Sequence, residues 1–353
     1  MRPRAALVLW LVLVGGCAEA GSYEAVETFF LRNDGADMPV WITGNTDAQS
    51  VLIFLNGGPG GGSSGFWKFT AFSQLAEKYT LVFWDQRSAG FTLGSPPEAT
   101  LTAEASALDL DLLVEVIRAR LPGRRVFLMG HSWGGQLGSI YLSDPVRQAK
   151  IAGWVEVDGA HNFKAGSRLS AEWVKERASQ RLLEPSLSRD DRTYWTEAIT
   201  WYEHNPVDSW GIDFGGYPTE WIKHVEHVVK ANGYVPADKR GLVDSEFKKA
   251  GTYSRFVGLY ATGMARWYGR PLWNLDATPV MSAITLPTLI IWGEEGEEDG
   301  ILPRALAADA LDALGTPPDQ KRVVYFEDSG HSPLIDAPFE FAAAVIAFVD
   351  EAR

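Results

Sequence analysis

Short apolar runs rich in β-branched and aromatic residues alternate along this chain with segments whose apolar residues recur at helical spacing. This alternation is typical of βαβ units, which build a mostly parallel sheet. Core strands are expected at 51–55, 81–84, 126–129, 153–157, 288–292 and 323–326, with an antiparallel edge at 23–31 and 39–44. Helices are expected at 103–120, 134–143 and 338–352. The sequence therefore predicts an α/β fold with a sheet of about eight strands.

One long stretch, residues 160–284, departs from this alternation. Its pattern is helical and aromatic, and it holds half of the chain's 14 tryptophans. Open α/β sheets bind ligands beyond the carboxyl ends of their strands, so an insertion between two strands predicts a helical lid there. Most of these tryptophans are expected to form the core of the lid itself, with one or two lining a pocket. Residues 17–159 and 285–353 would then form the core domain.

The N-terminal residues have the layout of a bacterial secretory signal. Arg2 and Arg4 precede ten apolar residues, which are followed by Gly15, Gly16 and Cys17. A membrane-spanning helix needs about 20 apolar residues, so this run is too short to be a permanent anchor. The segment ending at Cys17 resembles a lipobox, in which residues 1–16 are removed and the cysteine is lipidated. We therefore expect an exported, lipid-anchored protein of the cell envelope, the alternative being an incidental cysteine in an ordinary cleaved leader.

The segment Gly130-His131-Ser132-Trp133-Gly134 has the G-x-S-x-G form of a nucleophile elbow. In such an elbow a serine lies on a sharp turn between a strand and a helix, which exposes its hydroxyl oxygen. The expected strand 126–129 leads into the turn, and the small-residue helix that begins at Gly134 leads out of it. Ser132 is therefore the predicted nucleophile.

A serine hydroxyl needs a base that removes its proton, and the base is a histidine further along the chain. Only six histidines are present, and His331 follows the expected strand 323–326, just before the last helix. His131 lies inside the elbow and cannot serve, and the other four lie in or next to the lid, where surface or packing roles are expected. These four are His161, His204, His224 and His227. The sequence predicts His331 as the general base.

The acid that orients the base is expected after the strand 288–292, where five carboxylates compete between Gly293 and Gly300. Asp299 is the predicted acid, because Asp299 followed four residues later by Pro303 resembles the acid loop of many α/β-hydrolases. Glu294 and Glu295 are the alternatives. The remaining side chains of this segment are expected to be solvated.

A tetrahedral intermediate also needs two backbone N–H donors. The residue after the nucleophile, Trp133, is expected to supply one, and Gly58 in the glycine-rich segment after the strand 51–55 the other. A phosphate-binding role for this segment is excluded, because no Gly-Lys-Ser/Thr follows it. We expect neither a metal nor a cofactor.

Three segments together resemble the proline iminopeptidase family of serine peptidases: 57–60, 85–90 and 130–135. The resemblance covers most of the chain outside the lid and implies the α/β-hydrolase fold with a Ser-His-Asp triad. The family usually has His where Asn56 stands and Gly where Ser88 stands, so this chain resembles a divergent member. The family binds the free amine of its substrates with lid carboxylates, and Trp201-Tyr202-Glu203 is similar to one such segment. The resemblance thus implies Glu203 as an amine anchor, the alternative being an exposed lid glutamate.

These patterns predict a serine hydrolase that acts on a peptide or a small acyl substrate. The leading hypothesis is an aminopeptidase that releases N-terminal residues, proline among them, through an acyl-enzyme. A carboxylic-ester hydrolase with the same triad is the alternative, and an inactive hydrolase-like binding protein is less favoured. The formal net charge of −13 argues against a non-specific nucleic-acid binder. Contact with a membrane is expected only through the N-terminal lipid.

Overall fold

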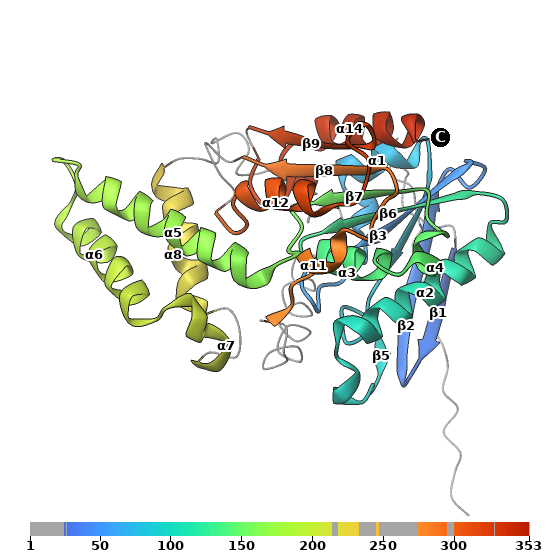
Figure 1. Cartoon of the computed structure of the whole chain (residues 1–353), viewed down its shortest axis with the longest axis horizontal. Coiled ribbons are helices and arrows are strands. Elements are labelled where there is room, and N and C mark those ends of the chain that lie inside the picture. The colour runs from blue at the N-terminus through green and yellow to red at the C-terminus, as the bar shows by residue number, and fades with distance from the viewer. Residues whose placement is uncertain are drawn as a thin grey trace, which may run out of the picture.

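The computed structural model describes residues 25, 27–213, 218–232, 245–246, 274–294, 300–327 and 329–352. At its centre is a nine-stranded sheet with the order β1-β2-β4-β3-β6-β7-β8-β9, in which the short β5 pairs with β2 (Figure 1). The strands are β1 Glu27–Asn33, β2 Ala36–Gly44, β3 Ser50–Leu55, β4 Thr80–Trp84, β5 Leu93–Gly94, β6 Arg125–His131, β7 Gly153–Val157, β8 Thr288–Gly293 and β9 Lys321–Phe326. β2 pairs antiparallel with β1 and β4, and the pairs from β4 to β9 are parallel. The predicted fold class is confirmed.

Two hydrophobic clusters cover the two faces of the sheet. One joins the sheet to the helices α2 Ala103–Arg120, α3 Trp133–Leu142, α11 Thr278–Met281 and α12 Ala305–Ala313. The other joins it to α1 Thr70–Ala76, α13 Pro333–Asp336 and α14 Pro338–Glu351. β3, β4, β7 and β8 are buried along their whole length, because helices lie on both sides of them. Such strands need continuous apolar runs, which is why they could be recognised in the sequence.

Parallel strands end at the same edge of a sheet, so the loops after β3, β4, β6, β7, β8 and β9 gather there. In Figure 1 the arrowheads of β8 and β9 point toward a helical arm that projects from this edge. The arm is formed by α5 Phe163–Leu182, α6 Arg189–His204, α7 Trp210–Asp213 and α8 Thr219–Asn232, and it follows β7 in the chain. These helices lie within the segment 160–284 that the sequence predicts to be a lid.

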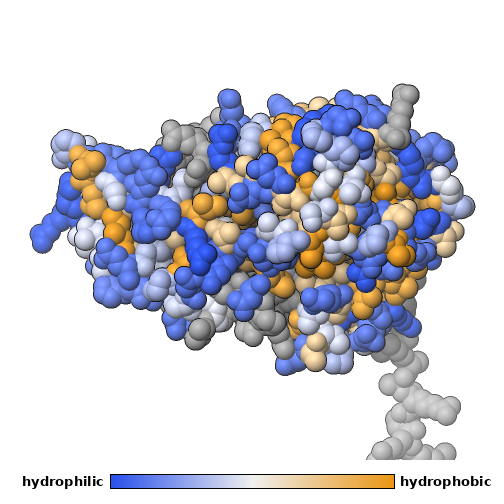
Figure 2. Space-filling view, in the orientation of Figure 1, coloured by the Kyte–Doolittle hydropathy of each residue, from blue (hydrophilic) through white to orange (hydrophobic). Residues whose placement is uncertain are grey.

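The segment 160–284, called the lid after its predicted role, has a hydrophobic core among its described helices. Four of its tryptophans are buried in one cluster and Trp201 packs against it, whereas Trp267 and Trp273 lie outside the described residues. The four are Trp173, Trp195, Trp210 and Trp221. Figure 2 shows polar and apolar residues interspersed over the visible face of both the lid and the core. No helix within the described ranges is long and apolar enough to cross a membrane.

Candidate active site

Ser132 lies between the last residue of β6 and the first residue of α3. Its backbone has φ 55° and ψ −117°, in a region that residues other than glycine seldom adopt. Three backbone hydrogen bonds hold this conformation: Ser132 N–H donates to Val157 O at 3.0 Å, and Ser132 O accepts from the N–H groups of Gly135 at 2.8 Å and Ala160 at 2.9 Å. Ser132 remains only half-buried. This backbone geometry is that of a nucleophile elbow.

The glycines of the elbow are required by close backbone contacts. A Cβ atom on Gly134 would lie 1.9 Å from the carbonyl oxygen of Leu55, and one on Gly130 would lie 2.3 Å from that of Gly134. Neither position can therefore hold a side chain without a shift of the backbone. The tight passage of α3 past the end of β3 explains the G-x-S-x-G spacing.

His331 is brought to the elbow by its neighbour in space, His131. The Nε2 atom of His131 lies 2.6 Å from the carbonyl oxygen of His331, and the two ring centroids are 5.0 Å apart. A carbonyl oxygen only accepts hydrogen bonds, so the proton of the neutral His131 ring is on Nε2. His131, which is not the expected base, thus fixes the loop that carries the expected base beside Ser132.

This contact has a consequence for the pH dependence of stability. Burial, together with the nearby His331, lowers the pKa of His131 to about 3. In the unfolded chain a histidine has a pKa of about 6.5, so between these values the unfolded state binds one proton more than the folded state. The free energy of unfolding should therefore fall as the pH falls from about 6.5 to 3, by at most about 1.4 kcal/mol per pH unit.

The variant His131→Gln should lose this dependence, because the glutamine amide reaches about as far as histidine Nε2, can still donate to His331 O and does not titrate. Urea unfolding of both proteins at several pH values between about 7 and 4 compares the pH dependence of their stability. This range covers most of the window between the unfolded and folded pKa values of His131. We expect the unfolding midpoint of the wild type to fall more steeply than that of the variant. Parallel curves would show that His131 does not titrate as described.

The loop after β3 lies directly against the elbow. A Cβ atom on Gly57 would lie 3.1 Å from Ser132 Cβ and 3.2 Å from His131 Nδ1, so a side chain here would require a small shift of these neighbours. The next residue, Gly58, has a φ of +135°, a conformation that favours glycine. The two residues expected to donate to an oxyanion, Gly58 and Trp133, are therefore on segments that meet at Ser132.

Asp85 joins this loop to the loop after β4. Its carboxylate is fully buried and accepts hydrogen bonds from Ser63 N and Phe91 N, both at 2.6 Å. Burial raises the pKa of Asp85 to about 7. Ser88, at the position where proline iminopeptidases usually have glycine, has a φ of 55°, which explains that preference.

Arg87 forms a buried ion pair with Asp109 of α2, with Nε 2.6 Å from Oδ2 and Nη2 2.7 Å from Oδ1. Gln86, between Asp85 and Arg87, contacts Trp133 and Asn56. Each side chain of the Asp85-Gln86-Arg87 segment therefore connects a different pair of elements. The segment, which the sequence offers only as part of a family resemblance, is a structural junction of the site.

Asp299 and Glu295 lie outside the described residues, and the structure describes the two ends of their segment. At the first end, Glu294 forms an ion pair with Arg304. At the other end, Gly300 O accepts a hydrogen bond from Ser170 Oγ of the lid, and Leu302 O accepts one from Trp292 Nε1 at 2.7 Å. The residues after Asp299 are thus fixed against both the lid and the end of β8.

A carboxylate that the sequence analysis did not consider lies at the same edge of the sheet. Asp158 follows β7 directly, is fully buried, has a φ of 40°, and accepts a hydrogen bond from Gly293 N at 2.9 Å. A Cβ atom on Gly293 would lie 1.9 Å from Gly330 O, next to His331. Its signal in the sequence is an acidic residue directly after the expected core strand 153–157.

Two lid carboxylates have contrasting surroundings. Glu203, near the end of α6, is exposed. Glu246 is buried against the core, where its Oε1 accepts from Thr70 Oγ1 at 2.8 Å and its Oε2 from Thr70 N at 2.5 Å. Glu246 is therefore a lid residue anchored at the start of α1.

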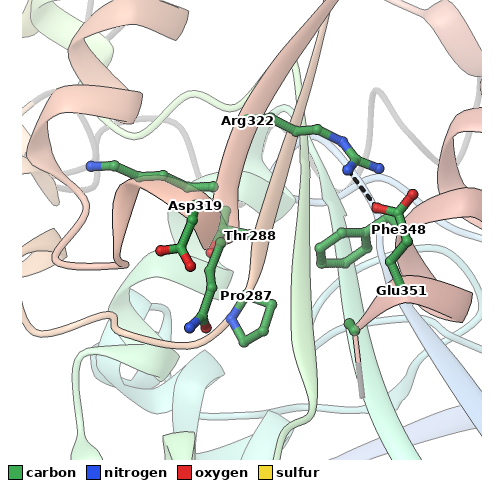
Figure 3. Close-up of a pocket in the computed structure, with 9 residues that line it drawn as sticks. Pro287, Thr288, Asp319, Arg322, Phe348 and Glu351 are labelled. Atoms are coloured by element: carbon green, nitrogen blue, oxygen red, sulfur yellow. Dashed lines mark hydrogen bonds and ion pairs between the residues drawn. The ribbon is translucent and has the colours of Figure 1, made fainter.

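Other features of the described residues do not compete with this site. No group of three or more His, Cys, Asp and Glu residues in the described ranges is arranged to hold a metal ion. A pocket of about 240 Å³ lies at the first residues of β8 and β9, Thr288 and Lys321, and so at the opposite edge of the sheet from Ser132 (Figure 3). Arg322 and Glu351 form an ion pair beside it.

Several known proteins are similar to this chain in sequence or in structure. Residues 52–344 match the model of the alpha/beta hydrolase family. The chain is 22% identical over 317 residues to the probable aminopeptidase YbaC of Bacillus subtilis (strain 168), which covers 85% of this chain and 89% of that protein.

Solved structures show the same fold at low sequence identity. The proline iminopeptidase of Mycobacterium smegmatis superposes with a TM-score of 0.62 at 16% identity, over 92% of this chain and 98% of that one. The esterase RhEst1 of Rhodococcus sp. ECU1013 superposes with a TM-score of 0.56 at 16% identity, over 94% of this chain and 100% of that one. The family model, which matches most of the chain, and the elbow around Ser132 agree: this chain belongs to the alpha/beta hydrolase family.

Proposed function

We propose that this protein is an exported serine hydrolase with Ser132 as nucleophile, His331 as general base and Asp299 as the acid that orients the base. The observation that carries the proposal is the elbow conformation of Ser132, with the His331 loop hydrogen-bonded to the adjacent His131 at 2.6 Å. The strained Ser132 and the loop that carries His331 are far apart in the sequence. They meet at the carboxyl edge of the sheet, where α/β folds bind their ligands.

In the proposed reaction, Ser132 Oγ attacks the carbonyl carbon of the substrate while His331 removes the hydroxyl proton. The backbone N–H groups of Gly58 and Trp133 stabilise the negative oxygen of the tetrahedral intermediate. His331 then donates the proton to the leaving amine or alcohol, which departs and leaves an acyl group on Ser132. A water molecule, activated by His331, hydrolyses this acyl-enzyme and restores the serine.

The preferred substrate class is a peptide or aminoacyl amide with a free N-terminus, with proline among the residues released. This part of the proposal is supported by the similarity to an aminopeptidase and by the fold shared with a proline iminopeptidase. An ester hydrolase is the second candidate, because the exposed position of Glu203 provides no buried partner for a substrate ammonium group.

The two candidates differ in their response to acetylation of the substrate. An aminopeptidase that requires a free amine should hydrolyse proline p-nitroanilide with a kcat/KM about 10² times that for the N-acetyl derivative. Acetylation would leave the lid carboxylate that binds the amine without a partner, and an unpaired charge under a lid costs several kcal/mol. Steady-state kinetics on both compounds and on p-nitrophenyl butyrate measure this preference. If the acetylated amide or the ester is the better substrate, the ester hydrolase replaces the aminopeptidase.

Variants of the lid carboxylates locate the amine anchor in the same assay. Glu203→Gln should reduce the preference for the free amine, whereas Glu197→Gln, an exposed glutamate on the same helix, serves as the matched control. Glu246→Gln tests the buried carboxylate next to Thr70. A full preference in Glu203→Gln would exclude Glu203 as the anchor.

Export and lipid attachment belong to the same proposal and are supported by the N-terminal sequence. Residues 1–16 and Cys17 lie outside the described residues. With a diacyl anchor at Cys17, the enzyme would meet its substrates at the cell envelope.

A further inference from the structure

Gln86 connects the two segments that carry the expected oxyanion donors. Its side chain is buried, its Oε1 accepts a hydrogen bond from Trp133 Nε1 at 2.9 Å, and its Nε2 donates to Asn56 O at 3.2 Å. Asn56 in turn donates from Nδ2 to Gly62 O at 2.7 Å, which closes the glycine-rich loop on itself. Because β3 lies between β4 and β6 in the sheet, this one amide links the ends of three neighbouring strands.

The contact matters because the two donors have different origins. Trp133 N–H belongs to the first turn of α3, and Gly58 N–H to the loop after β3. Stabilisation of an oxyanion depends on donors held about 2.7–3.1 Å from the place where the negative charge develops. A small change in the separation of the two segments would therefore reduce stabilisation of the transition state more than binding of the substrate.

The chemistry of the amide suits this connection. Trp133 Nε1 can only donate and Asn56 O can only accept, so the side chain between them must both accept and donate. Asn56 also precedes Gly57, where an added Cβ atom would lie 3.1 Å from Ser132 Cβ, so the position of Asn56 affects that of the loop beside the serine. Trp133 is completely buried, which leaves the ring no alternative hydrogen-bond partner in water.

We propose that Gln86 is a positioning residue for the oxyanion hole: it sets the distance between Trp133 and the loop that carries Gly58. This inference rests on the serine mechanism proposed above and is independent of whether amides or esters are the preferred substrates. Gln86 does not touch the substrate and acts through the two segments that it joins.

The test uses Gln86→Leu and Trp133→Phe, alone and together, with hydrolysis of p-nitrophenyl butyrate and fluorophosphonate labelling of Ser132 as readouts. Gln86→Leu should lower kcat by about 10- to 100-fold and leave KM within about twofold, a smaller loss than that of a whole oxyanion donor. Trp133→Phe removes the Nε1 donor and keeps the backbone N–H, so it should lower kcat as Gln86→Leu does. The double variant should be no slower than Gln86→Leu, because both changes break the same hydrogen bond.

Gln148→Leu is the matched control. Gln148 is also a buried glutamine, and the three residues that it bonds lie outside the site. Its Nε2 donates to Leu142 O at 2.9 Å and to Ala283 O at 2.8 Å, and its Oε1 accepts from Thr285 N and Thr285 Oγ1, both at 2.9 Å. It should lower the melting temperature by a similar amount and leave kcat unchanged. A loss of kcat in Gln86→Leu without a matching loss in Gln148→Leu therefore reports positioning rather than general stability.

The outcomes separate the two proposals. If the wild type forms the Ser132 adduct but Gln86→Leu loses no more kcat than Gln148→Leu, or if KM alone rises, the positioning role is wrong and the serine mechanism stands. Additive losses in the double variant would also contradict it. If Gln86→Leu does not fold, Trp133→Phe is the deciding variant: a loss of kcat with little change in KM supports the positioning role, and a rise in KM alone contradicts it. If the wild type forms no adduct on Ser132, the serine mechanism fails and the role of Gln86 fails with it.

Discussion

Replacing Ser132 by alanine should lower kcat by a factor on the order of 10⁶ and abolish labelling by a fluorophosphonate probe. The expected loss is this large because the serine oxygen forms the covalent bond of the acyl-enzyme, and no other group in the elbow can replace it. The strained φ of 55° and the neighbouring His331 loop make Ser132 the residue that the probe should modify.

Peptide mapping by mass spectrometry measures this result, with Ser139→Ala as the matched control. Ser139 is a buried serine of α3, the helix that follows the elbow, and its replacement should leave labelling and kcat as in the wild type. An adduct on any residue other than Ser132, or full activity of Ser132→Ala, would contradict the serine mechanism.

Replacing Asp299 by asparagine should lower kcat by a factor on the order of 10³ or more, because the imidazole of His331 would lose the carboxylate that orients it and stabilises its charge. KM should change little, since the acid does not contact the substrate. The measurement is steady-state kinetics on a p-nitrophenyl ester, with circular dichroism to confirm that the variant is folded.

Three further variants make the assignment of the acid specific: Glu294→Gln, Glu295→Gln and Asp158→Asn. Glu294 is paired with Arg304, so its replacement should cost much less than that of Asp299. Asp158 accepts from Gly293 N and is expected to act on the backbone of the site rather than on the base. If Asp299→Asn leaves kcat nearly unchanged and one of these three variants loses most of it, the acid is the residue replaced in that variant.

Much of the fold was predictable because its signals are local. Strands buried on both faces require continuous apolar runs, and the runs at 51–55 and 153–157 coincide with β3 and β7 to within one residue. The helix expected at 103–120 has those bounds in the structure, where Thr102 caps it by accepting from Ala105 N. β5 was missed because Leu93 and Gly94 are too few residues to produce an alternating pattern.

Ser132 and His331 could be proposed from the sequence because each is marked by its own surroundings, the elbow in one case and the strand–loop–helix order in the other. The sequence by itself therefore determined the fold class and these two candidates. The roles of Gln86, Asp85 and His131 became visible only in the tertiary structure. Their hydrogen bonds reach Trp133, Ser63 and His331, which are 47, 22 and 200 residues away in the chain. Such contacts depend on the strand order β4-β3-β6-β7-β8-β9, which the crossover connections decide and no local pattern encodes.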